Sequence, residues 1–185
     1  MRHIGIAVIT TGHRELPEYP RIEGADFIVF EDHQLRGPAW ARNQCLRLLE
    51  GCEHIFLFDD DFTFRPLEVL RASGEFAAWK LDYAEAYLGR VTYQSAAAVR
   101  RIGGYDEGHG RYGLERQGRC ARAERAGLRG DRGIADPTLS ACIVPLVGRP
   151  AILTDEEKEA HIPDAARIYK RETTGDWFRA YQPTA

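Results

Sequence analysis

The chain has 185 residues, of which 44% are hydrophobic and 29% are charged, and its formal net charge is −3 at pH 7. This length predicts one domain with a sizeable core. The small net charge gives no overall reason to expect nucleic acid or an acidic membrane as the partner. No apolar run approaches the ~20 residues of a membrane-spanning helix, and the first residues are too polar for a signal peptide. We therefore expect a soluble, cytoplasmic protein.

The cysteines show no metal-binding pattern in the sequence. Cys45, Cys52, Cys120 and Cys142 form no C-x-x-C pair and have no zinc-ligand spacing. We expect reduced, partly buried thiols in a reducing compartment.

Short apolar runs rich in β-branched and aromatic residues predict strands at 4–10, 25–31 and 54–58. Two prolines make 15–24 a loop, and Pro38 opens a helix that ends near Leu49. Later helices are predicted at 67–73, 95–102, 114–126, 155–161 and 165–172. One or two strands are predicted within 83–93, and another at 140–147. This alternation of strands and helices predicts an α/β three-layer sandwich around a mainly parallel central sheet.

Polar side chains follow the first three predicted strands. Thr10 and Thr11 follow the first, Asp32 follows the second, and an aspartate cluster at 59–61 follows the third. Ligands of parallel α/β sheets bind at the carboxyl ends of the strands. We therefore expect these side chains to share one site.

The cluster Asp59-Asp60-Asp61 predicts a divalent metal site. Three adjacent carboxylates repel one another, and Mg²⁺ or Mn²⁺ prefers such hard oxygen ligands. Alternation along an extended segment places Asp59 and Asp61 on the same side. Asp60 would then meet a nucleotide ribose or face solvent. The alternative interpretation is an acidic surface turn.

Six segments, in order, resemble motifs of the family-2 glycosyltransferases of the GT-A kind. They are the opening strand 4–11, the strand with its terminal acid 27–32, the G-x-x-x-A-R-N helix 37–44, the D-x-D segment 54–61, the G-G-F-D-E-like turn 102–107 and the G-Y-G-x-E-like segment 112–115. The resemblance covers roughly residues 4–130. It implies one GT-A-like domain with a nucleotide-sugar-binding half at 1–66, an acceptor-side half at 67–150 and a C-terminal extension at 151–185.

The resemblance also implies an activity: transfer of a sugar from a nucleotide-diphosphate sugar, expected to be a UDP-sugar, to an acceptor hydroxyl with inversion. The acceptor would be a glycan, a small molecule, a protein or modified DNA. The cofactor would be Mn²⁺ or Mg²⁺, acting as a Lewis acid on the diphosphate. The implied nucleotide-sugar-binding residues are Thr10, Thr11, Asp32, Arg36, Arg42, Asp59 and Asp60. The implied metal ligands are Asp59 and Asp61, with a late histidine, His161, as a further candidate. For Arg42 the alternative is an ordinary exposed helix arginine.

The implied general base is Glu115, with Asp106 in reserve. The family usually has Glu-Asp at this point and uses the aspartate, whereas this chain has Glu115-Arg116. Neighbouring arginines weaken a carboxylate as a base. The alternative role of Glu115 is that of an acid favoured by the positive end of a helix.

The arginines at 116, 119, 122, 125 and 129 recur every three or four residues and predict a basic, solvated helix face, which could also meet a polyanion such as DNA. Two rival functions stay open. Asp59 and Asp61 fit the D-x-D-x-T motif of haloacid-dehalogenase phosphatases, and the Glu115-Arg116 pair would suit a GT-A-like module that binds without catalysis.

Overall fold

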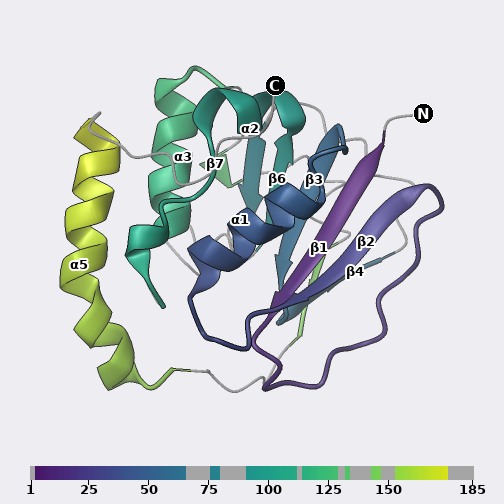
Figure 1. Ribbon diagram of the computed structural model, residues 1–185, viewed down its shortest axis with the longest axis horizontal. Coiled ribbons are helices and arrows are strands. Elements are labelled where there is room, and N and C mark those ends of the chain that lie inside the picture. The colour runs from purple at the N-terminus through teal and green to yellow at the C-terminus, as the bar shows by residue number, and fades with distance from the viewer. Residues whose placement is uncertain are drawn as a thin grey trace.

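The computed structural model describes residues 3–65, 76–79, 91–111, 114–128, 132–133, 143–146 and 153–174. In these residues the central sheet has the strand order β2-β1-β3-β6-β5-β7 (Figure 1). The strands are β1 Ile4–Thr10, β2 Ala25–Glu31, β3 His54–Asp59, β5 Phe76–Trp79, β6 Val91–Ser95 and β7 Arg132–Gly133. β6 runs antiparallel to both of its neighbours, and the other described strands of this sheet all run the same way. The predicted mainly parallel α/β sheet is confirmed.

Alternation along the central strands fills two cores. Ala7, Ile9 and Leu57 face α1 Pro38–Leu48 and α2 Ala96–Ile102, which cover one face of the sheet. Val8 and Phe58 face the opposite side. There, Tyr19 and Ile22 of the loop between β1 and β2 pack with β4 Phe62–Phe64, which pairs antiparallel with β8 Ile143–Pro145 and gives the third layer. Burying both faces of β1 and β3 explains why these strands read as continuous apolar runs.

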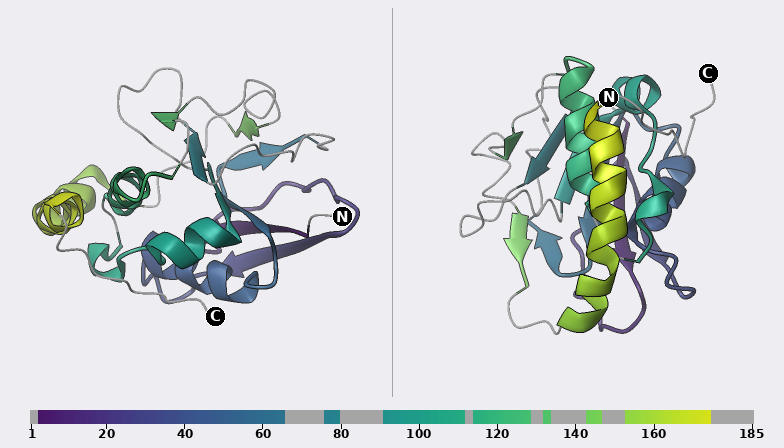
Figure 2. Two further views of the ribbon diagram at one scale, coloured as in Figure 1. Left: turned by 90° about the horizontal axis from the view of Figure 1, so that it is seen from above. Right: turned by 90° about the vertical axis from the view of Figure 1, so that its left-hand side faces the viewer.

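Three helical elements stand beside the sheet: η1 Glu107–His109, α3 Glu115–Arg125 and α5 Asp155–Thr174. α5 lies alongside α3 (Figure 2) and buries Ala165 and Ile168. We predicted two helical pieces separated near Pro163, but α5 is continuous. Proline removes one helical hydrogen bond, and the packing of α5 on α3 and η1 offsets that loss. No described helix is long and apolar enough to cross a membrane.

The strands predicted at 4–10, 25–31 and 54–58 and the helices at 38–49, 95–102 and 114–126 match β1, β2, β3, α1, α2 and α3 within a residue or two. The predicted helix 67–73 lies outside the described residues, and of the predicted segment 83–93 the structure describes only the part in β6. The short strands β4, β5 and β7 were not predicted. Elements of two to four residues carry too little periodicity to be recognised.

Candidate active site

A pocket of about 330 Å³ lies where the carboxyl ends of β1 and β3 meet the segment after β2. In Figure 1 this is the lower end of the molecule, toward which β1 points and where α5 begins. Its polar lining includes Thr10, Thr11, Asp32, Asp59, Asp60, Asp61, Arg14, Arg111, Arg116 and Lys158. The pocket thus gathers the three predicted strand-end groups into one site. Its lining holds four cationic side chains and four carboxylates, and two of the cations, Arg14 and Arg116, pair directly with Asp60 and Asp59.

Asp60 joins β1 to the loop that follows it. Its Oδ2 accepts a hydrogen bond of 2.8 Å from the Thr10 hydroxyl, and its Oδ1 lies 2.6 Å from Nη1 of Arg14. The side chain of Asp60 is only 5% exposed. The suggestion that Asp60 faces solvent was therefore wrong. Backbone pleating predicts which way a strand residue points, but this residue lies in the turn after β3.

Asp59 lies between two arginines from different helices. Arg42 of α1 donates to Oδ1, and Nη1 of Arg116 in α3 lies 3.3 Å from Oδ2. The same two guanidinium groups hold Oε1 of Glu115, at 3.1 Å from Arg42 and 3.3 Å from Arg116. Asp59 and Glu115 are therefore bridged by shared cations. Both Asp59 oxygens hold arginines, which does not suit the free nucleophile that a phosphatase would need.

Arg42 is almost fully buried, with 1% of the residue exposed. Burial alone would lower its pKa, but the attraction of Asp59 and Glu115 outweighs that effect, and the pKa is raised above its ordinary value. The guanidinium is thus a permanent buried cation. The alternative of an ordinary exposed helix arginine was wrong, because partners 17 and 73 residues away in the chain decide its environment.

The neighbouring Asn43 clamps α1 to the turn before η1. Its amide donates to the carbonyl of Tyr105 and to Oε1 of Glu107, and its Oδ1 accepts from the Tyr105 backbone N–H. The Arg42-Asn43 pair of the family motif therefore has a positioning role here. It fixes the segment carrying Glu115 relative to the segment carrying Asp59.

Asp32 and the backbone around it shape the other side of the pocket. Its Oδ2 accepts from the Gly37 N–H at 2.9 Å. Its Oδ1 and the Thr11 hydroxyl are buried polar atoms without a hydrogen-bond partner within the described residues. Leu35, in the lining, has φ 51°, which a non-glycine residue adopts only where the surroundings impose it. Unpartnered acceptors and local strain together favour a ligand-binding role for this wall.

Five predicted site residues lie outside the pocket lining. Arg42 and Glu115 are buried behind Asp59, and the other three are Asp106, Arg36 and His161. Asp106 caps η1 through Gly108 N–H and pairs with Arg171 of α5. Arg36 is exposed and lies over the Trp40 ring, 4.7 Å from its centroid. His161 lies on α5, about one turn beyond Lys158. The proposed roles of these three remain predictions, and the geometry does not favour them.

Several pocket residues were not predicted from the sequence, among them Arg14, Arg111, Leu153 and Lys158. Arg14 lies in the loop after β1, and the last two sit around the start of α5. There Thr154 and Glu157 form a capping box, with the Glu157 N–H 3.2 Å from the Thr154 hydroxyl and the Thr154 N–H 2.8 Å from the Glu157 carboxylate. The T-x-x-E pattern could have revealed the helix start, but not its position beside the pocket.

The predicted solvated arginine face of α3 was wrong for two of its members. Arg119 and Arg122 are 0% and 2% exposed. Arg119 donates to Gln94 and to the carbonyl of Gly103, and Arg122 donates to the carbonyls of Ile102 and Gly104. These carbonyls end α2, whose unsatisfied acceptors favour cations. These two arginines therefore serve the fold, whereas Arg125 is exposed, Arg116 lines the pocket and Arg129 lies outside the described residues.

The carboxylates of 59–61 have the oxygen chemistry that Mn²⁺ and Mg²⁺ prefer, yet arginines already balance two of them. Within the described residues the three side chains do not bring one oxygen each into a single tight cluster. Such ions bind through one or two carboxylates plus substrate phosphates, so the donor set still fits.

Comparison with solved structures identifies the fold. The catalytic domain of Drosophila β1,4-galactosyltransferase 7 in complex with xylobiose matches with a TM-score of 0.52 at 14% identity. A mutant of the same enzyme, in complex with manganese, UDP-Gal and xylobiose, matches with a TM-score of 0.56 at 15% identity. Both matches cover 87% of this chain and 79% of theirs. No protein-family model matches the sequence, and no curated protein is detectably similar to it. The protein thus has the GT-A fold.

Proposed function

We propose that the protein is a glycosyltransferase that moves a sugar from a UDP-sugar to an acceptor hydroxyl with the help of Mn²⁺ or Mg²⁺. One observation carries this proposal: Thr10, Thr11, Asp32 and the cluster 59–61 line the same pocket, at the carboxyl end of a GT-A sheet. The fold neighbours, one of them bound to manganese and UDP-Gal, support the choice of donor.

In this proposal the nucleoside binds between β1 and the segment after β2. Asp32 Oδ1 and the Thr11 hydroxyl are buried acceptors in need of a donor, and uracil and ribose offer N–H and O–H groups. The hydrogen bond from Gly37 N–H fixes the Asp32 carboxylate before the ligand arrives. A preorganised carboxylate of this kind selects a base with an N–H at the matching edge.

The diphosphate would lie between the aspartates and the cations of the opposite wall. Asp59 and Asp61 would hold the metal, which supplies Lewis-acid stabilisation of the departing diphosphate. Arg14, Arg116 and Lys158 would take the phosphate oxygens, a geometry for which guanidinium groups are well suited. The four carboxylates and four cationic side chains of the lining nearly cancel in charge. The charge of a divalent ion likewise cancels that of a diphosphate, so the two together can bind here without leaving an uncompensated charge.

Glu115 is the proposed base, and it would take the proton of the acceptor hydroxyl on Oε2. This atom is buried and lacks a hydrogen-bond partner among the described residues, whereas Oε1 holds Arg42 and Arg116. The acceptor's class stays open among glycan, small molecule, protein and modified DNA.

The donor site is tested by calorimetry with UDP-sugars in the presence of Mn²⁺. We expect Asp61→Asn to weaken manganese-dependent binding more than tenfold, since an amide is a poorer ligand for a hard cation. Asp164→Asn, at an exposed carboxylate of α5, is the matched control and should bind as the wild type does. The proposal is wrong if the wild type binds no UDP-sugar, or if both variants bind equally well.

The base is tested separately with Glu115→Gln, which keeps the shape of the side chain. Loss of general-base catalysis is expected to lower transfer by about 10²–10⁴ with donor binding retained. One observation favours a second candidate, a module that binds the donor without transfer: Glu115 is buried and paired with two arginines. Donor binding without transfer to any acceptor, and without hydrolysis of the donor, would establish that alternative.

A further inference from the structure

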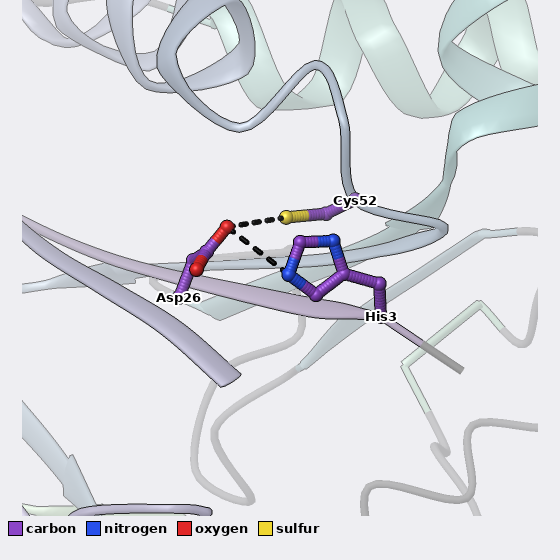
Figure 3. Close-up of side chains that lie close together, drawn as sticks. All are labelled: His3, Asp26 and Cys52. Atoms are coloured by element: carbon purple, nitrogen blue, oxygen red, sulfur yellow. Dashed lines mark hydrogen bonds and ion pairs between the residues drawn. The ribbon is translucent and has the colours of Figure 1, made fainter. Parts of the chain in front are cut away.

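A second cluster of ligand-type side chains lies at the opposite end of the sheet from the pocket (Figure 3). His3 precedes β1, Asp26 belongs to the start of β2, and Cys52 lies in the loop between α1 and β3. Parallel pairing of β2, β1 and β3 brings these amino-terminal ends together. One potential ligand atom from each residue falls within 4.8 Å of the others, which no other group of three such residues in the described part of the chain achieves.

From this cluster we propose a binding site for a borderline-soft divalent transition-metal ion such as Zn²⁺, held by His3 Nε2, an Asp26 oxygen and Cys52 Sγ. The distances fit. His3 Nε2 lies 3.2 Å and Cys52 Sγ 3.6 Å from Asp26 Oδ2. Tetrahedral zinc with ordinary bond lengths separates N from O and S from O by roughly 3.3–3.6 Å.

The surroundings orient two of the ligands. His3 Nδ1 faces the Gly51 carbonyl at 3.4 Å, so Nε2 is the nitrogen directed at Asp26. A histidine that ligates a metal commonly donates its other N–H to a backbone carbonyl in this way. The sulfur of Cys52 occupies the space above Gly5, where an added Cβ would lie 2.8 Å from it. Both ligand atoms are thus held in place before any ion arrives.

The charges suit a divalent cation. The Cys52 thiol donates to Asp26 Oδ2, the same oxygen that lies 3.2 Å from His3 Nε2. A metal ion bound between these groups would displace the thiol proton to solvent. Thiolate and carboxylate then balance the two charges of the ion. No spacing pattern in the sequence indicates this site, because its ligands lie 23 and 26 residues apart.

Cobalt substitution tests the site, because Co²⁺ bound to a thiolate gives a charge-transfer absorption that oxygen ligands do not. We expect the full chain, freed of metal by a chelator, to bind Co²⁺ with this absorption and to lose it when Zn²⁺ is added. His3→Gln and Asp26→Asn change exposed side chains and should each weaken Co²⁺ binding at least tenfold. Cys52→Ser should abolish the absorption.

Two controls match these variants. His33→Gln alters an exposed histidine that also pairs with an acid, Glu31, but has no cysteine beside it. Cys45→Ser removes a different buried thiol. Both should keep the absorption of the wild type. If Cys52→Ser fails to fold, the Co²⁺ affinities of His3→Gln and Asp26→Asn still test whether these side chains bind the ion. The proposal is overturned by a wild type without the absorption, or by an absorption that His3→Gln and Asp26→Asn leave unchanged.

Discussion

Replacing Arg42 by methionine tests the buried charge network between α1, β3 and α3. The substitution keeps an unbranched apolar chain of similar length but removes the cation shared by Asp59 and Glu115. Glu115 is 1% exposed, and after the substitution Nε of Arg116 would remain 3.3 Å from its Oε1. Removing one member of a buried pair costs about 3–5 kcal/mol, and the remaining arginine places Arg42→Met at the lower end, about 3 kcal/mol.

Urea unfolding measures this loss. With a slope of about 2 kcal/mol per molar urea, the midpoint should fall by about 1.5 M. Arg47→Met is the matched control, since it removes an exposed arginine from the same helix and should change stability by less than about 0.5 kcal/mol. In the double variant Arg42→Met/Glu115→Gln the cost should be smaller than the sum of the single costs, because the stranded carboxylate is gone. Equal losses for Arg42→Met and Arg47→Met, or strict additivity, would refute the reasoning.

Three further outcomes follow from local geometry. Gly37 has φ 108° and an added Cβ would lie 1.9 Å from a backbone oxygen, so Gly37→Ala should lower the free energy of unfolding by more than about 2 kcal/mol, whereas Gly51→Ala, with open space around it, should be nearly neutral in the same urea assay. Thr154→Ala removes the cap of α5 and should cost about 1 kcal/mol by thermal unfolding, and a cost equal to zero would mean that the cap contributes nothing. Burial raises the pKa of Cys45 to about 12, so the unfolded thiol ionises first as pH rises above about 9; stability should then fall with pH, by at most about 1.4 kcal/mol per unit for this group, and Cys45→Ala should show a flatter pH dependence.

The sequence predicts the amino-terminal half of the fold well, because the burial of each element there is visible in its own residues. Strands such as β1 and β3 are buried on both faces, and a strand buried in this way is a continuous apolar run. Convergence of Thr10, Asp32 and Asp59 at one edge then follows from parallel pairing alone. The antiparallel direction of β6 could not be derived, because it depends on a connection whose length and course the residue pattern does not specify.

Sequence reasoning failed most clearly for arginine. Arg42, Arg119 and Arg122 have the spacing of ordinary helix-surface residues, yet each is buried against partners far away in the chain. Their burial is possible because Asp59, Glu115 and the carbonyls at the end of α2 compensate the charge. A helical period reveals which residues share a face of the helix, but not whether a second helix or a carboxylate covers that face.

The ion pair between Arg14 and Asp60 has a consequence for the loop that joins β1 to β2. This connection contains no helix. Arg14 pairs with Asp60, and the Tyr19 hydroxyl donates to the carbonyl of Phe62. Arg14 and Arg21 are the points in the loop that trypsin recognises. A ligand that draws Asp60 away from Arg14 would release a contact that holds this loop, so the rate of tryptic cleavage in the loop reports whether the neighbouring pocket is occupied.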